Sequence, residues 1–154
     1  MNYIQDLRRQ VGHAPILVVG ASVFTLDQQD RILLLLRVDN GCWGPPGGAL
    51  EPGEVVEAAA ARETLEECGL TVHKPNLYGV FSGEEQFYRY PNGDEVHFVN
   101  IVYLCRDFDG AITLSAEHTD WHWFPLEALP ESISPPMIPI LNQFAAEAQR
   151  QALE

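Results

Sequence analysis

Three glutamates in one short segment have a spacing that could hold a metal ion. Glu63, Glu66 and Glu67 stand at i, i+3 and i+4 in a stretch without glycine or proline. On a helix such positions fall within an arc of about 100°. Carboxylate oxygens are the ligands that Mg²⁺ and Mn²⁺ prefer, and Mg²⁺ commonly joins protein carboxylates to substrate phosphates. The spacing therefore indicates a magnesium site, with Mn²⁺ as the other candidate ion.

The alternative interpretation is a solvated acidic helix face that confers only solubility. Like charges at i and i+4 disfavour a helix, and two carboxylates ~4 Å apart at an effective dielectric constant near 20 repel by about 4 kcal/mol. A divalent cation would reverse this repulsion. In both interpretations the glutamates form an outer stripe. The other side of the helix is expected to pack on a sheet through Ala61, Thr64, Leu65 and Cys68.

A glycine-rich segment, Trp43-Gly44-Pro45-Pro46-Gly47-Gly48, precedes the acidic residues. Glycine has no Cβ, so backbone groups there can come close to a cation. Residues 40–53 hold too many helix and strand breakers for a regular element, whereas residues 55–68 hold none and are rich in alanine and glutamate. We therefore expect a loop that leads directly into a helix.

Before this loop, the sequence predicts one helix and two strands. Apolar residues at helical spacing predict a short amphipathic helix over residues 3–11. Residues 16–25 and 31–38 are aliphatic runs separated by a polar turn, which is typical of paired strands. We expect a β-hairpin at this point.

After the acidic helix, the sequence predicts a second hairpin. Residues 77–90 and 95–106 flank Pro91-Asn92-Gly93-Asp94, and an Asn-Gly pair accepts the positive φ values of a hairpin turn. The remaining elements are a strand at 121–124, a turn at 125–129 and a terminal helix at 138–152.

Strands interrupted by one helix and closed by another predict a mixed sheet between helices, an α/β or α+β fold. A chain of 154 residues ordinarily forms one domain, and 46% hydrophobic and 20% charged residues are close to globular averages. We expect a single domain over residues 1–154, with a short N-terminal helix and a C-terminal helix.

The net charge and the cysteine content of the chain limit the partners and the compartment that we expect. Nine basic residues against 22 acidic ones give a net charge of -13, which repels nucleic acid polymers. A small anionic substrate would therefore need a cation or a local cluster of arginines at its site. Cys42, Cys68 and Cys105 form no CxxC pair and no even disulfide set, which favours reduced thiols in a cytoplasmic protein. The apolar run 15–26 is too short to span a bilayer. We expect neither nucleic acid polymer nor membrane as a partner.

The residues Gly48, Glu54 and Arg62-Glu63-Thr64-Leu65-Glu66-Glu67-Cys68-Gly69-Leu70 together resemble the Nudix box of the Nudix hydrolase family, in its MutT-type form. One position departs from the pattern, because the family usually has an aliphatic residue in place of Thr64. The resemblance covers roughly residues 15–130, including the later segment Trp123-Phe124-Pro125-Leu126. It implies the family's α/β/α sandwich.

The resemblance also implies a metal site. Glu66 and Glu67 correspond to the principal metal ligands, and the carbonyl of Gly47 corresponds to a further ligand. Glu63 corresponds either to a ligand or to the base that activates water. A loop acid completes the set, with Glu117 as the candidate and Asp120 as its rival.

Supporting and substrate-binding residues follow from the same resemblance and from residue chemistry. Arg62 and Glu54 look like the pair that positions the ligands. Arg37 is either a phosphate contact or a surface cation. A base could stack on an aromatic residue, and the candidates are Trp43, Phe87, Tyr88 and Tyr90. Tyr88 stands at a spacing from Leu70 that is associated in the family with dinucleoside polyphosphate hydrolases.

The function implied is a divalent-metal-dependent nucleotide pyrophosphohydrolase. Water activated by the metal would cleave the pyrophosphate linkage of a nucleoside diphosphate joined to another moiety. The alternative is a catalytically inactive Nudix-like module that binds nucleotides or regulates. The intact set Glu54, Arg62, Glu63, Glu66 and Glu67 argues against that alternative. The substrate stays open between dinucleoside polyphosphates, nucleoside triphosphates, ADP-ribose and nucleotide sugars, and a homodimer is a candidate assembly.

Overall fold

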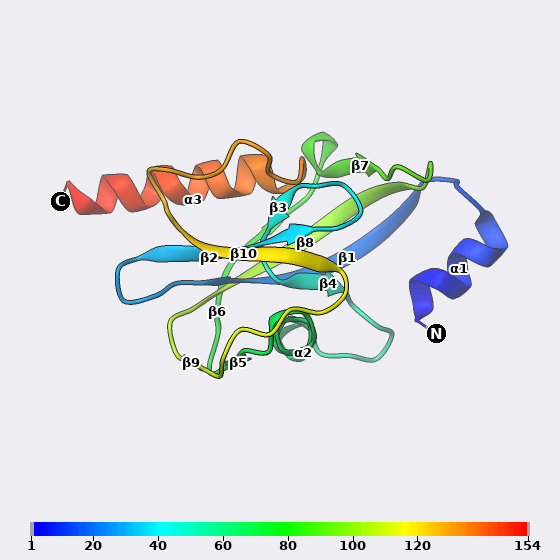
Figure 1. The fold of residues 1–154 in the computed structure, drawn as a ribbon. Coiled ribbons are helices and arrows are strands. Elements are labelled where there is room, and N and C mark those ends of the chain that lie inside the picture. Colours follow the sequence, from blue (N-terminus) through cyan, green and yellow to red (C-terminus); the bar gives the residue numbers. More distant parts are fainter. Residues whose placement is uncertain (1, 154) are drawn as a thin grey trace.

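The computed structural model describes residues 2–153, and Figure 1 shows strands flanked by helices. All three predicted helices are present, as α1 (Tyr3–Val11), α2 (Val56–Cys68) and α3 (Met137–Ala152). The longer strands are β1 (Ile16–Thr25), β2 (Arg31–Arg37), β6 (Asn76–Phe81), β8 (Glu95–Cys105) and β10 (His118–Pro125). The short elements are β3 (Trp43–Gly44), β4 (Gly47–Ala49), β5 (Thr71–Val72), η1 (Glu84–Gln86), β7 (Phe87–Arg89) and β9 (Phe108–Asp109).

A mixed sheet forms the centre of the molecule. Its strand order is β4-β1-β8-β6, and β7 also pairs with β8. β1 and β8 are parallel along their whole length, from Ile16 opposite Val96 to Thr25 opposite Cys105. The other pairs in this sheet are antiparallel. A second sheet has the order β10-β2-β3, and β5 pairs with β9.

The predicted hairpin of residues 16–25 and 31–38 is wrong, because its two strands lie in different sheets. Only an isolated bridge joins them, between Leu26 and Ile32. The hydrogen bonds of β1 go to β4 and β8, and those of β2 go to β10 and β3. Both strands are largely buried, so each needs neighbours on both edges, and one hairpin partner could not satisfy them.

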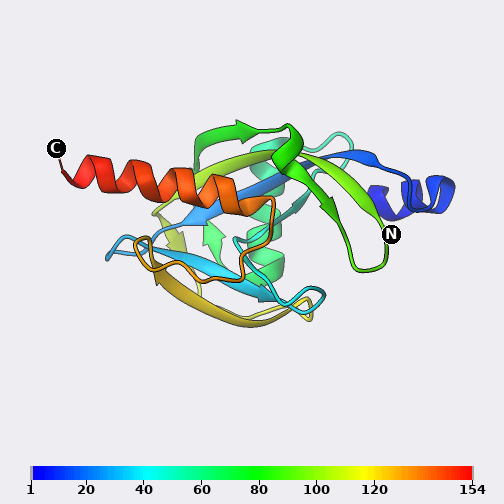
Figure 2. The same ribbon diagram turned by 90° about the horizontal axis from the view of Figure 1, so that it is seen from above.

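Helices cover the strands from two sides. In Figure 1, α3 lies above the strands and α2 below them, and Figure 2 shows α3 along the seam between the two larger sheets. On β1, Ala21 and Val23 join the cluster that contains Ala59 and Ala60 of α2. Phe24 points the other way and packs against Phe144 of α3, with ring centroids 5.3 Å apart. This alternation confirms the mixed α/β/α arrangement.

Details of the loops differ from expectation. The glycine-rich loop of residues 40–53 carries two short strands, β3 and β4, and the 3₁₀ helix η1 divides the strand expected at 77–90. In the second hairpin turn only Gly93 uses a positive φ, of 94°. The strand expected at 121–124 extends over all of β10. Among residues 2–153, no helix has the length and hydropathy needed to cross a membrane.

Candidate active site

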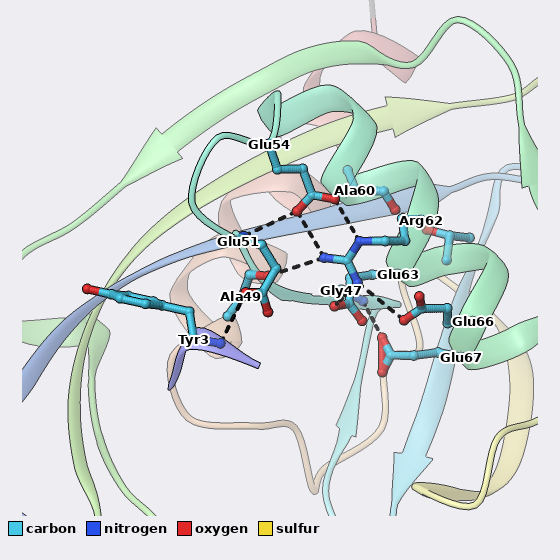
Figure 3. A network of polar contacts seen from close by, with 11 residues as sticks. Tyr3, Gly47, Ala49, Glu51, Glu54, Ala60, Arg62, Glu63, Glu66 and Glu67 are labelled. Carbon is cyan, nitrogen blue, oxygen red and sulfur yellow. Dashed lines mark hydrogen bonds and ion pairs between the residues drawn. The ribbon is translucent and has the colours of Figure 1, made fainter. Parts of the chain in front are cut away.

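Arg62 on α2 lies at the centre of a carboxylate network (Figure 3). Its Nε donates to Glu54 Oε2 at 2.7 Å and its Nη2 to Glu54 Oε1 at 3.0 Å. Its Nη1 donates to Glu63 Oε1 at 2.9 Å and to Glu66 Oε2 at 3.2 Å. One guanidinium therefore offsets three carboxylates, and the repulsion expected from the sequence is smaller than its bare value. The Arg62 hydrogen bonds hold the pKa of the Glu54 carboxyl below its usual value.

The three glutamates of α2 do not form an outer stripe, so that expectation is wrong. The Glu66 side chain is 58% exposed and the Glu63 side chain 17%, whereas Glu67 is 5% exposed. Leu65, expected to pack on a sheet, is 52% exposed. The helix is rotated so that Glu67 points into the protein. Thr64 is fully buried, and its hydroxyl donates to the Ala60 carbonyl at 2.8 Å, which satisfies this polar group within the helix.

Glu67 is a buried carboxyl with two polar neighbours. Its Oε1 accepts a hydrogen bond from the Gly47 N–H at 2.7 Å, and its Oε2 lies 3.5 Å from His118 Nε2. Burial raises the pKa of the Glu67 carboxyl to about 8; the Gly47 N–H opposes this rise, and the charges of Glu63 and Glu117 add to it. The pKa of the His118 imidazole is lowered, chiefly by burial. Without a cation this pair is therefore largely neutral.

The glycine loop leaves room for the glutamates. A Cβ on Gly48 would lie 2.5 Å from Glu63 Oε1, and a Cβ on Gly47 would lie 2.5 Å from the Ser22 Cβ. Only glycine fits at these two positions without displacing its neighbours. Burial raises the pKa of the Glu63 carboxyl, although the hydrogen bond from Arg62 lowers it. The Glu63 carboxylate thus lies between the backbone of the glycine loop and the guanidinium of Arg62.

The donor set fits a hard divalent cation. The candidate ligands are the carboxylates of Glu63, Glu66 and Glu67 and the carbonyl of Gly47, all of them oxygen donors. Two buried polar atoms nearby, Ser22 Oγ and His118 Nδ1, have no hydrogen-bond partner among the described residues. Within residues 2–153, no three acidic, histidine or cysteine side chains already surround one point as a finished metal site. The ligand set therefore stays a prediction, and Glu66 is held by Arg62.

A cavity of about 370 Å³ opens beside these carboxylates. Gly47, Gly48 and Glu67 line one part of it. Its floor is one face of the central sheet, built from alternate residues of two neighbouring strands: Val18, Gly20 and Ser22 on β1 and Val96, Phe98 and Asn100 on β8. The loop after β10, the start of α3, β7 and the helix α1 supply the walls. A ligand in this cavity would therefore lie against the acidic end of α2.

Three of the five candidate substrate residues line the cavity, namely Arg37, Tyr88 and Tyr90, whereas Trp43 and Phe87 do not. Arg37 lines it but is held by Asp39 through two hydrogen bonds, of 2.8 and 2.7 Å. The Tyr88 hydroxyl also lines it and accepts a hydrogen bond from Asn40 Nδ2 at 2.9 Å. Trp43 packs edge-on against Phe124, at 5.0 Å between ring centroids, and joins the core cluster near α3.

The two loop acids occupy different surroundings. The charge of Glu117 adds to the raised pKa of both Glu63 and Glu67. Asp120 accepts a hydrogen bond from the adjacent Trp121 N–H at 2.8 Å. The choice between Glu117 and Asp120 stays a prediction.

Sequence reasoning missed many residues of this cavity, and three polar ones lie close to its chemistry or its floor. Ser22 and Asn100 lie within apolar strands, and His118 directly follows Glu117. A polar residue in a buried aliphatic run was the available signal, since such a group needs a partner or a ligand. That signal could have singled out Ser22 and Asn100.

The structure thus joins a sheet flanked by helices to a carboxylate-bearing helix that follows a Gly-Gly loop and buries Glu67. The model of the NUDIX domain matches residues 17–144, and this chain belongs to the Nudix family. A MutT Nudix hydrolase from Burkholderia pseudomallei has a similar structure, with a TM-score of 0.70 and 32% identity. The similarity covers 83% of this chain and 98% of that one.

Two curated relatives show the range of activities that accompany this resemblance. An ADP-ribose pyrophosphatase of Methanocaldococcus jannaschii is 34% identical over 109 residues, which are 69% of this chain and 61% of that protein. A bis(5'-nucleosyl)-tetraphosphatase (asymmetrical) of Sus scrofa is 34% identical over 98 residues, 61% of this chain and 64% of that protein. The chain therefore spans less than two thirds of either relative. Nudix enzymes generally act on small nucleotide-derived substrates with divalent metal ions.

Proposed function

We propose that this protein hydrolyses the pyrophosphate linkage of a nucleoside diphosphate derivative with the help of Mg²⁺. The observation that carries the proposal is Glu67, a carboxyl buried beside Gly47 at the edge of a cavity large enough for part of a nucleotide. A solvated acidic face would not place one of its carboxyls in the interior, where ionisation is costly. A cation bound there would offset that cost.

The residues of the site would have different roles in the reaction. Glu66, Glu67, the Gly47 carbonyl and Glu117 would hold the cation, which when bound supplies charge neutralisation and activation of water. Glu63 would serve either as a further ligand or as the base. Glu63 is the candidate base, because its raised pKa favours accepting a proton and Arg62 Nη1 fixes its Oε1. Arg62 and Glu54 position these carboxylates. As a ligand, Glu66 would have to give up its 3.2 Å contact with Arg62.

Substrate contacts belong to the rest of the cavity. Arg37 would reach a phosphate while it stays paired to Asp39, which keeps its guanidinium in place. Tyr88 would stack on the base, and its hydroxyl is fixed by Asn40. Trp43 would act indirectly, through the position of the adjacent glycine loop.

The proposal is tested with nucleoside triphosphates, nucleotide sugars, ADP-ribose and dinucleoside polyphosphates, each assayed with Mg²⁺ and with Mn²⁺. We expect cleavage of at least one substrate to a nucleoside monophosphate or similar phosphate ester, and loss of that activity in excess EDTA. Full turnover in EDTA would contradict the metal-dependent reaction. Nucleotide binding without turnover would instead support the inactive binding module.

Location and assembly are part of the same proposal. Cys42, Cys68 and Cys105 are free thiols, which suits the reducing cytoplasm. The homodimer stays a prediction. Sedimentation velocity at several protein concentrations would detect it.

A further inference from the structure

The cavity floor contains a polar chain that ends in a single hydrogen-bond acceptor. Asn100 on β8 and Gln86 in η1 are buried, 7% and 2% exposed. Asn100 Nδ2 donates to Gln86 Oε1 at 2.6 Å, and Gln86 Nε2 donates to the Pro136 carbonyl at 2.9 Å. Pro136 lies at the N-terminus of α3. The chain therefore runs from the floor of the cavity to its wall.

The order of donors and acceptors in this chain is fixed at one end. A backbone carbonyl can only accept a hydrogen bond, so Gln86 must turn its NH₂ group toward Pro136 and its Oε1 toward Asn100. Asn100 must then turn its own NH₂ group toward Gln86. The remaining atom, Asn100 Oδ1, receives no hydrogen bond from any residue between 2 and 153. The amide cannot flip without placing two donors or two acceptors opposite each other.

The free oxygen lies over Gly20 in the floor of the cavity. A Cβ on Gly20 would come within 2.6 Å of Asn100 Oδ1, so only glycine leaves this space open. Gly20 and Asn100 both line the cavity and are register partners on β1 and β8. Apolar side chains, Val18 and Phe98, lie beside them on the same face. A flat ring could rest on this face with its edge toward the oxygen.

We infer that Asn100 is a specificity-determining residue that selects nucleotides whose base carries an exocyclic amino group. Its Oδ1 accepts a hydrogen bond from that group, and Gln86 keeps it from presenting a donor instead. A base with an oxo group at the same position would meet a second acceptor and leave both oxygens unsatisfied. Adenine and cytosine carry the favoured group; hypoxanthine and uracil carry the disfavoured one. The inference rests on the proposed nucleotide function.

The test compares binding of AMP with IMP and of CMP with UMP by calorimetry, because these monophosphates have no pyrophosphate linkage to hydrolyse. Purine ribonucleoside monophosphate, with hydrogen at the same ring position, is the reference. For the ring that binds, we expect the amino nucleotide to bind on the order of 10-fold more tightly than its oxo partner, with the reference between them. Asn100→Leu should bring the ratio close to one.

Two further variants separate recognition from folding. Gln86→Met keeps Asn100 but releases its amide, so the oxo nucleotide should gain affinity and the ratio should fall. Asn142→Leu, at an exposed position on α3, is the matched control and should keep the parental ratio. An amino-to-oxo ratio near one in the parent, or an unchanged ratio in Asn100→Leu, would overturn the inference.

Turnover assays distinguish this inference from the proposed function. Metal-dependent hydrolysis together with equal binding of both partners refutes the role of Asn100 alone. Selective binding without hydrolysis of any substrate supports Asn100 and refutes the proposed reaction. A protein that binds none of these monophosphates and hydrolyses none of the pyrophosphate substrates refutes both.

Discussion

Glu67 combines burial, hydrogen bonding and a candidate metal-ligand role in one side chain. Its carboxyl is buried against the Gly47 N–H and His118, and its pKa is raised. The folded protein without metal therefore gains nothing from its ionised form. Substituting Glu67 should therefore separate its effect on the stability of the fold from its effect on turnover.

We expect Glu67→Gln to be at least as stable as the parent in EDTA, with a gain of about 1 kcal/mol or more in the free energy of unfolding. The glutamine oxygen can still accept from Gly47, and no ionisable group remains buried. Turnover should fall on the order of 10²-fold or more. Mg²⁺ should no longer raise the melting temperature. Urea unfolding, calorimetric melting and steady-state kinetics measure these three quantities.

The matched control for this variant is Glu57→Gln, on the exposed side of the first turn of α2. It removes the same charge from the same helix and should change neither turnover nor the response to Mg²⁺. Parental activity in Glu67→Gln would contradict the assignment of Glu67 to the metal site.

At the scale of elements, the turn between β1 and β2 connects the two larger sheets. Asp27 accepts hydrogen bonds from the Gln29 N–H at 3.0 Å, the Arg31 N–H at 2.9 Å and Arg31 Nε at 2.8 Å. Burial alone would raise the pKa of the Asp27 carboxyl, but these bonds outweigh it and the pKa is lowered. This carboxylate therefore stabilises the fold only while it is ionised.

The sign of the pH effect follows from that lowered pKa. The contribution of Asp27 is fully present above the ordinary pKa of 3.8 and is lost as pH falls through the lower folded value. We expect Asp27→Asn to be less stable than the parent at neutral pH, with a difference that shrinks below about pH 4. Urea unfolding from pH 7 to pH 3 measures it. A constant difference across this range would contradict the role of ionisation.

Elements with local signals could be predicted, and those that depend on distant partners could not. The end of α2 near Gly69 follows from local residues, as does the turn at Gly93. The neighbours of β2 lie far along the chain, in β10, and no local pattern identifies them. The burial of Glu67 depends likewise on Gly47 and His118. Helical spacing therefore placed three glutamates together but could not tell which one faced inward.

The helix α1 lies outside the segment that matches the NUDIX domain, yet it forms part of the site. Asn2, Ile4, Gln5 and Arg8 line the cavity. Arg8 anchors this end through its Nη2, which donates to the Glu95 carbonyl at 2.7 Å, and the Tyr3 N–H donates to Glu51 near the carboxylate network (Figure 3). Substrate preference can therefore differ between relatives that share the same core.

For the molecule as a whole, the net charge of -13 is a source of instability as well as solubility. Because NaCl screens repulsion between exposed charges, we expect the metal-free protein to become more stable as NaCl rises from about 0.01 to 0.15 M. Urea unfolding in EDTA at neutral pH measures this. The same series near the sequence pI of about 4.6 should show a weaker dependence. Stability that falls with salt at neutral pH would show that local ion pairs outweigh the overall repulsion.

The long parallel ladder between β1 and β8 also sets the order in which this chain can assemble. Ile16 through Thr25 face Val96 through Cys105, so the ladder closes a loop that contains the whole of α2. Closing that loop costs conformational entropy before the hydrogen bonds of the ladder form, and this cost slows folding. During synthesis on the ribosome, β1 cannot pair with β8 until most of the chain has been made. The acidic helix is thus made early but buries its Glu67 carboxyl only late, when β10 brings His118.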